Sequence, residues 1–469
     1  MASEPPNPPS PPTPPPPSSP SPHPSGASGP RSGVLQPPTG TRDFYPAEYN
    51  RLRYVTETWR AVSVRHGFEQ IDGPTFEHLD LYKIKSGDGI VSELFSFERF
   101  GGEKTYALRP EFTPTLARMY AARAGALPKP TRWFCTPTFF RAERPQRGRL
   151  REFSQWNCDI LGDDSPQADA EIIACAVEAL RALGLTSEHV KVRISHRAAV
   201  EQALVKRGVE PSQLPRWFTL LDRVGKISND AFIDEAMKLG MSSAMALQLI
   251  SMMTQATTFE EPTTQVMLAE ETSGTGPAYF KALFAALEEQ GVADWCLLNL
   301  GIVRGLAYYT GMVFEIHEAK GALRAIAGGG RYDKLIELFG GPPTPAVGFG
   351  MGDVVLSLVM EDKGVMPTDA VIAERLGLRP DAVVISNGTP EADAALPRVL
   401  SALRRGNLHA RRSGKATKNI GKLLQDAARM NARYCVILES GSLATLKDMT
   451  TGVQSQVPLG EVVARIARR

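Results

Sequence analysis

Hydrophobic residues recur three and four positions apart in two long segments of the chain, residues 48–66 and 167–183. This spacing places apolar side chains on one side of a helix, so both segments are predicted to be amphipathic helices. Gly67 fits the end of the first one. Residues 195–290 are also mostly helical in pattern and rich in Ala, Leu and Met. We expect them to form a helical insertion without a catalytic cluster.

Alternating apolar and polar residues predict strands in the first two thirds of the chain. Residues 68–77 alternate but contain Gly73-Pro74, and a proline inside a strand pattern indicates a sheet edge or a subunit boundary. A hairpin is expected at 94–108, with its turn at Gly101-Gly102. Further strands are expected at residues 133–140, 152–161, 295–303 and 311–317. Hairpins with flanking helices predict an α+β fold with an antiparallel sheet.

The pattern changes near residue 380. Short buried-type strands at 382–386 and 433–439 alternate with helical segments at 390–405 and 418–431. Alternating strands and helices predict a small α/β domain with a mainly parallel sheet over residues 380–469. The preceding folded domain is expected over residues 39–375.

Residues 1–38 hold 16 of the 37 prolines. Such a segment cannot build a core, so we expect a disordered, Pro-rich tail. It has no apolar stretch typical of a signal peptide, and with Arg31 as its only Lys or Arg it is a poor transit peptide.

Charge and cysteine content narrow the function classes. The chain has 53 Lys and Arg against 51 Asp and Glu, a net charge of +2. Residues 381–469 have 14 Lys or Arg and 7 Asp or Glu, a local excess of 14 − 7 = +7, which suits either a polyanionic partner or a solvated basic face. The five cysteines form no CxxC pair, which argues against zinc and disulfides and favours a reducing, cytoplasmic compartment. No metal site is assigned to protein side chains, and no apolar run is long enough to span a membrane.

A charged loop between the strands expected at 133–140 and 152–161 is the strongest candidate for chemistry. Pro145 and Gly148 break the strand pattern within it. Five arginines held by two strands would present planar guanidinium groups to a polyphosphate, although a solvated charged hairpin tip fits the composition equally well. The loop's charged residues are Arg141, Glu143, Arg144, Arg147, Arg149 and Arg151.

Two further segments contain unusual residue combinations. The first, VRGLAYYTG at residues 303–311, places a cation near paired tyrosines, which strand packing alone could also explain. The second, AGGGRYD at 327–333, is followed by PAVGFGMG at 345–352. Glycine runs form turns or let a ligand approach the backbone closely.

In this order and spacing the segments resemble a known family. The stretch FRAERPQRGRLREFSQ resembles motif 2 of the class II aminoacyl-tRNA synthetases, and in detail that of the histidyl-tRNA synthetases, plastid-like or bacterial branch. RGLAYY and GGRYD resemble two further family signatures, and residues 345–352 resemble the entry to motif 3. The resemblance covers residues 40–469.

The resemblance implies a fold, an activity and partners. It implies a class II catalytic domain with an antiparallel sheet, the helical insertion, and an anticodon-binding domain at 380–469. It also implies a homodimeric histidine–tRNA ligase with Pro74 at the dimer interface. Such an enzyme uses ATP with Mg²⁺ to activate L-histidine, releases pyrophosphate and AMP, and charges the 3′ end of tRNA(His).

It also implies roles for individual residues. The catalytic residues are Arg141, against the α-phosphate, and Arg304, against the histidine carboxylate and the α-phosphate. The remaining ATP-binding residues are Glu143 at the adenine amine, Arg149 at the β- and γ-phosphates, Gly348 and Gly350. The remaining histidine-binding residues are Glu111 and Thr113 at the amino group, Gln155 near the carboxylate and amine, and Asp159, Tyr309 and Tyr308 at the ring. The tRNA-binding residues are Gln146 and Arg151 at the acceptor end and Lys415, Lys418 and Lys422 at phosphates.

Three residues depart from the family pattern. Val355 stands where an adenine-packing arginine is usual, which leaves Phe139 or Phe153 to stack on the base. Asp159 stands where Glu is common, and Ala307 replaces an acidic residue. One alternative function is that of the non-charging paralogue that regulates ATP phosphoribosyltransferase, and another is an inactive tRNA-binding module. The paralogue generally lacks the C-terminal domain and erodes the motifs that are present here, so the sequence favours the enzyme.

Overall fold

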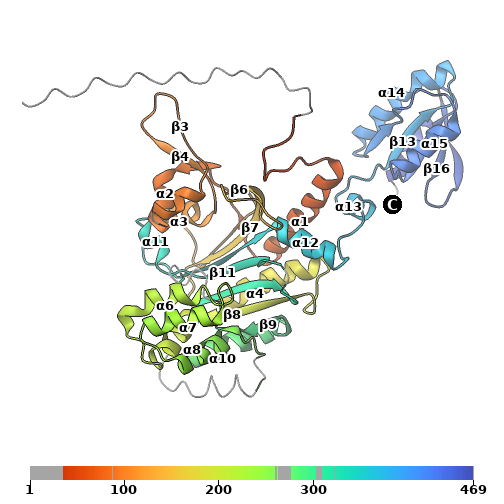
Figure 1. Ribbon diagram of the computed structural model, residues 1–469. Coiled ribbons are helices and arrows are strands. Elements are labelled where there is room, and N and C mark those ends of the chain that lie inside the picture. Colours follow the sequence, from red (N-terminus) through yellow and green to blue (C-terminus); the bar gives the residue numbers. More distant parts are fainter. Residues whose placement is uncertain are drawn as a thin grey trace, which may run out of the picture. The chain divides into compact units, whose positions relative to one another are not determined.

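A nine-stranded sheet is the centre of the N-terminal two thirds of the protein (Figure 1). The computed structural model describes residues 35–86, 88–258, 261, 276–302, 309–321 and 323–467. The sheet order is β1 (Glu69–Gln70), β5 (Thr131–Cys135), β7 (Glu152–Leu161), β12 (Ala346–Gly352), β11 (Ala327–Arg331), β10 (Met312–Glu318), β8 (Val190–His196) and β9 (Cys296–Leu298). The strand β6 (Thr138–Phe140) pairs with the first three residues of β7, 152–154. The inner pairs are antiparallel, and only the edge pairs β1–β5 and β8–β9 are parallel.

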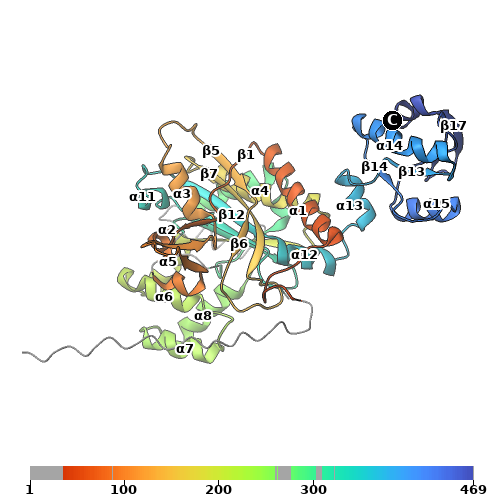
Figure 2. The same ribbon diagram turned by 90° about the horizontal axis from the view of Figure 1, so that it is seen from above.

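Two long helices cover one face of this sheet, α1 (Pro46–Arg65) and α4 (Pro166–Ala182), as Figures 1 and 2 show. Trp59 of α1 stacks on Trp156 of β7 with ring centroids 5.9 Å apart. Ser63 Oγ accepts a hydrogen bond of 2.9 Å from the Trp156 indole. Burial of these large apolar side chains fixes α1 against the centre of the sheet.

A smaller sheet of β2 (Phe76–His78), β4 (Thr105–Leu108) and β3 (Ser96–Glu98) lies in the segment between β1 and β5. With it belong α2 (Leu79–Ser86), the 3₁₀ turn at Asp88–Glu93 and α3 (Thr113–Ala121). Tyr120 of α3 packs against Trp133 of β5 and belongs to a buried cluster with α11 (Leu335–Leu338). The hairpin at Gly101-Gly102 forms as expected, with Gly101 at a positive φ of 70°.

The described residues between β8 and β9 are mostly helical. They form α5 (Arg197–Val205), a 3₁₀ turn at Pro211–Gln213, α6 (Leu214–Leu221), α7 (Asn229–Lys238), α8 (Ser243–Thr254), α10 (Gly276–Glu289) and a 3₁₀ turn at Ala293–Trp295. Ser228 and Ser242 cap α7 and α8 by accepting backbone N–H groups, as serine does at helix starts. The last helix, α10, packs against α4 beneath the large sheet.

After β12 the chain continues through α12 (Asp353–Asp362) and α13 (Asp369–Arg375) to a five-stranded sheet. Its order is β14 (Ala410–Arg412), β13 (Ala382–Ser386), β15 (Tyr434–Leu438), β16 (Leu443–Asp448) and β17 (Gln454–Pro458). The side chains of β13 alternate between two cores. One lies under α14 (Pro390–Arg405) and α16 (Val462–Ala467), the other under α15 (Ile420–Arg429). A 3₁₀ turn at Leu459–Glu461 precedes α16.

The α+β fold with a helical insertion and a C-terminal α/β unit is confirmed, with corrections of detail. The strand expected at 295–303 is limited among the described residues to Cys296–Leu298. The C-terminal sheet is not mainly parallel, because β16 and β17 join it as antiparallel strands. The strand expected at 133–140 is divided into β5 and β6 around Pro137, which has no N–H for a continuous ladder. No helix among the described residues is long and apolar enough to cross a membrane.

Candidate active site

Two adjoining cavities open on the face of the large sheet opposite α1 and α4. The larger has a volume of about 490 Å³ and the smaller about 190 Å³. Six residues line both of them and so mark their junction: Lys85, Arg141, Gln155, Tyr309, Gly328 and Gly350.

The alternation of β7 explains why polar side chains gather here. Trp156, Cys158 and Ile160 point into the core under the sheet. Their neighbours Gln155, Asn157 and Asp159 therefore point to the other face, where they line the smaller cavity. Gln155 and Asp159 were expected at histidine from the family resemblance, and the two-residue period of β7 explains why both face this cavity.

The smaller cavity collects most of the residues expected at histidine. Glu111, Thr113, Gln155, Asp159 and Tyr309 all line it. Sequence reasoning missed further polar lining residues, namely Lys85, Asn157 and Tyr332. Tyr332 is the tyrosine of the GGRYD segment, so the motif was noticed without its role in this pocket. Gly348 lines only this smaller cavity, whereas Gly350 lines both.

Asp159 lines the smaller cavity and is 4% exposed. Tyr332 donates a hydrogen bond to its Oδ1. A Cβ on Gly348, its partner across β7 and β12, would lie 2.0 Å from the same oxygen. Only glycine at 348 therefore leaves space for this carboxyl. Burial raises the pKa of Asp159 from 3.8 to about 7, opposed by the Tyr332 hydrogen bond and the charge of Lys85.

We expect the Asp159→Asn variant to gain stability relative to wild type as pH rises from 5 to 7.5. The pKa of Asp159 is higher in the folded state than in the unfolded chain, so between pH 4 and 7 the unfolded chain binds fewer protons than the folded protein. The free energy of unfolding of the wild type therefore falls as pH rises through this range, whereas that of the asparagine variant does not change for this reason. The difference in unfolding free energy should grow by on the order of a few kcal/mol over the window. Urea titrations at both pH values measure it; a difference that does not change with pH would contradict the assignment.

Gln155 and Gly350 both line the junction of the two cavities. The Gln155 side-chain amide donates to Asn157 Oδ1 at 2.9 Å. A Cβ on Gly350 would lie 2.7 Å from Gln155 Nε2. Because Gly348 and Gly350 of β12 have no side chains, they leave space for the polar side chains of β7.

The larger cavity collects most of the residues expected at ATP. Arg141, Glu143, Arg149 and Gly350 line it, together with Phe153. Arg141 Nε donates to the Pro110 carbonyl at 3.1 Å, and its guanidinium lies 5.2 Å from the centre of the Phe153 ring. This arrangement aims a fixed positive charge at the junction of the two cavities.

The arginine loop is a tight hairpin in the structure. Gln146 and Arg149 exchange two backbone hydrogen bonds, and Gly148 takes a positive φ of 78° in the turn. Gln146 is exposed at the tip. Arg149 pairs with Glu143 at 2.5 Å. Arg151 donates to the carbonyls of Glu143 and Thr39, so its guanidinium packs against the base of the hairpin.

At the start of α12, Val355 lies in the wall of the larger cavity, and a Cβ on Gly148 would touch it at 3.4 Å. Of the two candidates for base stacking, Phe153 lines this cavity, whereas Phe139 is fully buried and does not. Asp353 ties α12 to β7 by accepting from the Ser154 N–H at 2.8 Å.

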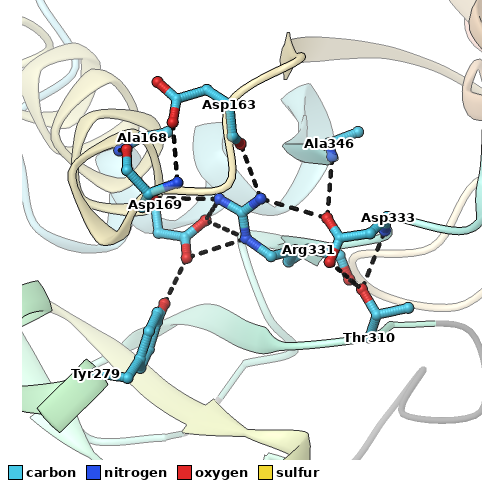
Figure 3. Close-up of polar contacts among 9 residues, drawn as sticks. Asp163, Ala168, Asp169, Tyr279, Thr310, Arg331, Asp333 and Ala346 are labelled. Carbon is cyan, nitrogen blue, oxygen red and sulfur yellow. Dashed lines mark hydrogen bonds and ion pairs between the residues drawn. The ribbon is translucent and has the colours of Figure 1, made fainter. Parts of the chain in front are cut away.

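A buried ion network links β11 to α4 (Figure 3). Arg331 of β11 donates to Asp169 Oδ1 at 2.6 Å and to the Asp163 carbonyl at 2.9 Å. Tyr279 of α10 donates its hydroxyl to the other oxygen of Asp169. On the far side Arg331 reaches Asp333, which also accepts from the Thr310 hydroxyl. The network joins α4, α10 and β11, and its arginine directly precedes Tyr332 in the chain.

The remaining predicted residues lie elsewhere in the chain. Arg304, Ala307 and Tyr308 fall outside the described residues. Pro74 is exposed between β1 and β2. Lys415, Lys418 and Lys422 are exposed between β14 and the first turn of α15. Among the described residues no group of three or more His, Cys, Asp or Glu side chains could hold a metal ion.

The sheet, with an arginine hairpin leading into β7, has the catalytic fold of the class II aminoacyl-tRNA synthetases. Residues 40–352 match the family model described as histidyl-tRNA synthetase. The chain is 36% identical over 432 residues to a histidine–tRNA ligase of Opitutus terrae, covering 91% of this chain and 97% of the relative. It is 39% identical over 425 residues to one of Haloarcula marismortui, covering 90% and 95%. The chain belongs to the histidyl-tRNA synthetase family.

Solved structures show the same fold. Histidyl-tRNA synthetase from Nostoc sp. PCC 7120 superposes with a TM-score of 0.74 at 23% identity, covering 94% of this chain and all of that one. A Bacillus halodurans protein described as an ATP phosphoribosyltransferase regulatory subunit/histidyl-tRNA synthetase superposes with a TM-score of 0.68 at 21% identity, covering 87% and 99%. Identities this low inform on the fold alone. The curated relatives named as ligases do not favour the regulatory alternative.

Proposed function

We propose that this protein is a histidine–tRNA ligase that activates L-histidine with ATP and transfers it to tRNA(His). The observation that carries the proposal is the pair of adjoining cavities, a small polar one and a larger cationic one, that meet at Arg141. A carboxylate in the first can reach a phosphate in the second only at that junction.

In the first step the histidine carboxylate attacks the ATP α-phosphate and pyrophosphate leaves. Negative charge builds on the phosphorus, so catalysis consists mainly of positioning and charge neutralisation. Arg141 supplies a fixed charge at the junction, and Arg149 steadies the outer phosphates. The Glu143–Arg149 pair must open when ATP enters, which frees Glu143 to accept from the adenine amine. By family resemblance Arg304 adds a second charge at the α-phosphate.

Selectivity for histidine follows from the polar lining of the smaller cavity. Glu111 and Thr113 take the amino group, and Asp159 with Tyr309 faces the imidazole. A buried site of this kind rejects analogues that leave its polar groups unpaired, by roughly four to five orders of magnitude. An editing domain is therefore not required.

In the second step the terminal ribose hydroxyl of tRNA attacks the carbonyl of the adenylate, and AMP leaves. We propose that a phosphate oxygen of the adenylate accepts the proton. A pH–rate profile traced to one enzyme side chain would contradict this.

The larger cavity has the volume and charge to accept ATP. Arg141 and Arg149 in its lining supply cations for phosphates, and Phe153 supplies an aromatic ring for the base. Mg²⁺ would arrive on the phosphates of ATP, since Mg²⁺ is usually held by substrate phosphates and water with few protein ligands.

Histidine-dependent exchange between ATP and labelled pyrophosphate tests the function. We expect exchange with histidine alone, no exchange with other amino acids, and loss of exchange in Arg304→Ala. Tight histidine binding without exchange would support the regulatory alternative and overturn the proposal.

The exposed lysines before α15 are proposed to hold tRNA phosphates, with residues 380–469 as the anticodon-binding domain. Replacing Lys415, Lys418 and Lys422 together by alanine should weaken tRNA binding and lower the slope of log K against log salt by about 2 to 3. Exchange without tRNA should stay at the wild-type rate. An unchanged salt slope would exclude these lysines from the interface.

We propose a homodimer with Pro74 in the interface. Beside it, Phe76 and Phe97 are 49% and 43% exposed and pack on each other with ring centroids 5.7 Å apart. Exposed aromatic clusters of this kind are typical of surfaces that a partner covers. A monomer in sedimentation equilibrium at micromolar concentration would exclude it.

A reducing, cytoplasmic compartment is proposed from the thiols. All five cysteines are buried and none forms a disulfide, and oxidation of any of them would disturb a core. Retention of all five free thiols in protein isolated from the cell under alkylating conditions would agree with this, and a disulfide would contradict it.

A further inference from the structure

Lys85, the last lysine of α2, lies where the two cavities meet. It lines both of them, and its side chain is only 13% exposed. Its ammonium group forms an ion pair with Glu111, the residue that takes the amino group of histidine in the proposed function. The Lys85 ammonium therefore occupies the position at Glu111 that the ammonium of bound histidine needs.

The charges of the smaller cavity show why this pair must rearrange. Its lining carries Lys85 and Arg141 as cations and Glu111 and Asp159 as acidic groups. Histidine brings an ammonium and a carboxylate. If Lys85 stayed on Glu111, the ammonium groups of Lys85 and of histidine would share one carboxylate in a largely buried site. Two like charges that contact the same carboxylate repel each other.

We propose that Lys85 is a further catalytic residue that exchanges partners when histidine binds: the substrate ammonium replaces Lys85 at Glu111, and Lys85 turns to the histidine carboxylate and the ATP α-phosphate. The inference rests on the proposed function. In this exchange no buried charge is left alone at any stage, which avoids the penalty of breaking one side of an ion pair. Because Lys85 lines both cavities, its side chain can serve either position without movement of α2.

The exchange also predicts which ligands the site prefers. A ligand that has an ammonium but no carboxylate displaces Lys85 without providing it with a new partner. A ligand with both groups compensates the displacement. The site should therefore favour the amino acid over its reduced alcohol, histidinol, through Lys85, whereas contacts to the imidazole ring and the ammonium are the same for both.

The test uses the full-length protein and three variants. Lys85→Met removes the charge and keeps the length of the side chain, Lys85→Arg keeps the charge, and Lys83→Met is the matched control on the same helix, at a position that lines neither cavity. ATP–pyrophosphate exchange gives kcat and KM for histidine. Calorimetric titration gives the affinities for histidine and histidinol.

In Lys85→Met we expect kcat/KM for histidine in exchange to fall by about 10- to 100-fold, the loss of one charge-assisted contact. Histidinol affinity should be unchanged or tighter, since the ammonium no longer competes for Glu111. Lys85→Arg should recover part of the loss, and Lys83→Met should behave as wild type.

Each other outcome is decisive. Unchanged exchange in Lys85→Met overturns the proposal, and an equal loss of histidine and histidinol affinity overturns it as well, because Lys85 would then only support Glu111. If the wild-type protein binds histidine but does not catalyse ATP–pyrophosphate exchange, the proposed function is contradicted instead. The affinities for histidine and histidinol would still test whether Lys85 changes partners.

Discussion

Arg141→Ala should lower kcat for histidine-dependent ATP–pyrophosphate exchange by about 100- to 1000-fold, the loss usual for one preorganised group that stabilises charge in the transition state. The side chain is fixed by the Pro110 carbonyl and the Phe153 ring at the junction of the two cavities. Its charge counts most when negative charge develops on the α-phosphate, so kcat should fall more than histidine affinity. Steady-state exchange at saturating substrates measures this.

Arg147→Ala is the matched control. Arg147 belongs to the same hairpin, is exposed, and pairs at 3.3 Å with Asp362 outside both cavities. Its removal should leave exchange within about twofold of wild type, because exposed ion pairs contribute little. Equal losses in the two variants would mean that the hairpin's net charge, and not the position of Arg141, supports the reaction.

Asp169→Ala should destabilise the protein by about 3–5 kcal/mol, the usual cost of removing one partner of a buried ion pair. Asp169 is fully buried, and the variant would leave the Arg331 guanidinium and the Tyr279 hydroxyl without their shared acceptor (Figure 3). Burial itself raises the pKa of Asp169, and Arg331 opposes this shift. Urea unfolding at neutral pH followed by tryptophan fluorescence gives the free energy.

The comparison variant is Glu201→Ala, which removes a partly exposed partner of Arg197 one helical turn away on α5. That change should cost no more than about 1 kcal/mol. Similar losses of unfolding free energy in both variants would show that the buried Arg331 network stabilises the fold no more than an exposed ion pair does. Because Tyr332 follows Arg331 and lines the smaller cavity, Asp169→Ala should also weaken histidine binding in whatever protein remains folded.

Local patterns in the sequence were sufficient for much of the fold. The strand at 152–161 and the helix at 390–405 have the boundaries that their periodicity predicts, because alternation and helical spacing are properties of neighbouring residues. The same period of two on β7 separates Trp156, which faces the core, from Gln155, which faces the cavity. Motif order was enough to place the chain in its family.

Pairings between distant segments were decided only in three dimensions. Periodicity gives no partner for a strand, so it did not reveal that β16 and β17 would add to the C-terminal sheet in antiparallel fashion. Nor did it place Lys85 beside Glu111, since that contact depends on how α2 packs over the loop before α3.

The glycines of β12 show most clearly what the sequence determined and what only the tertiary structure decided. From the sequence, the glycine runs that include Gly348 and Gly350 fitted either turns or the close approach of a ligand, and the family resemblance assigned both glycines to ATP binding. In the folded protein their missing side chains make room for Asp159 and Gln155 across the strand pair. The sequence determined which residues are small and which are polar, whereas cross-strand register decided which of them meet, because register is set by packing of the whole sheet.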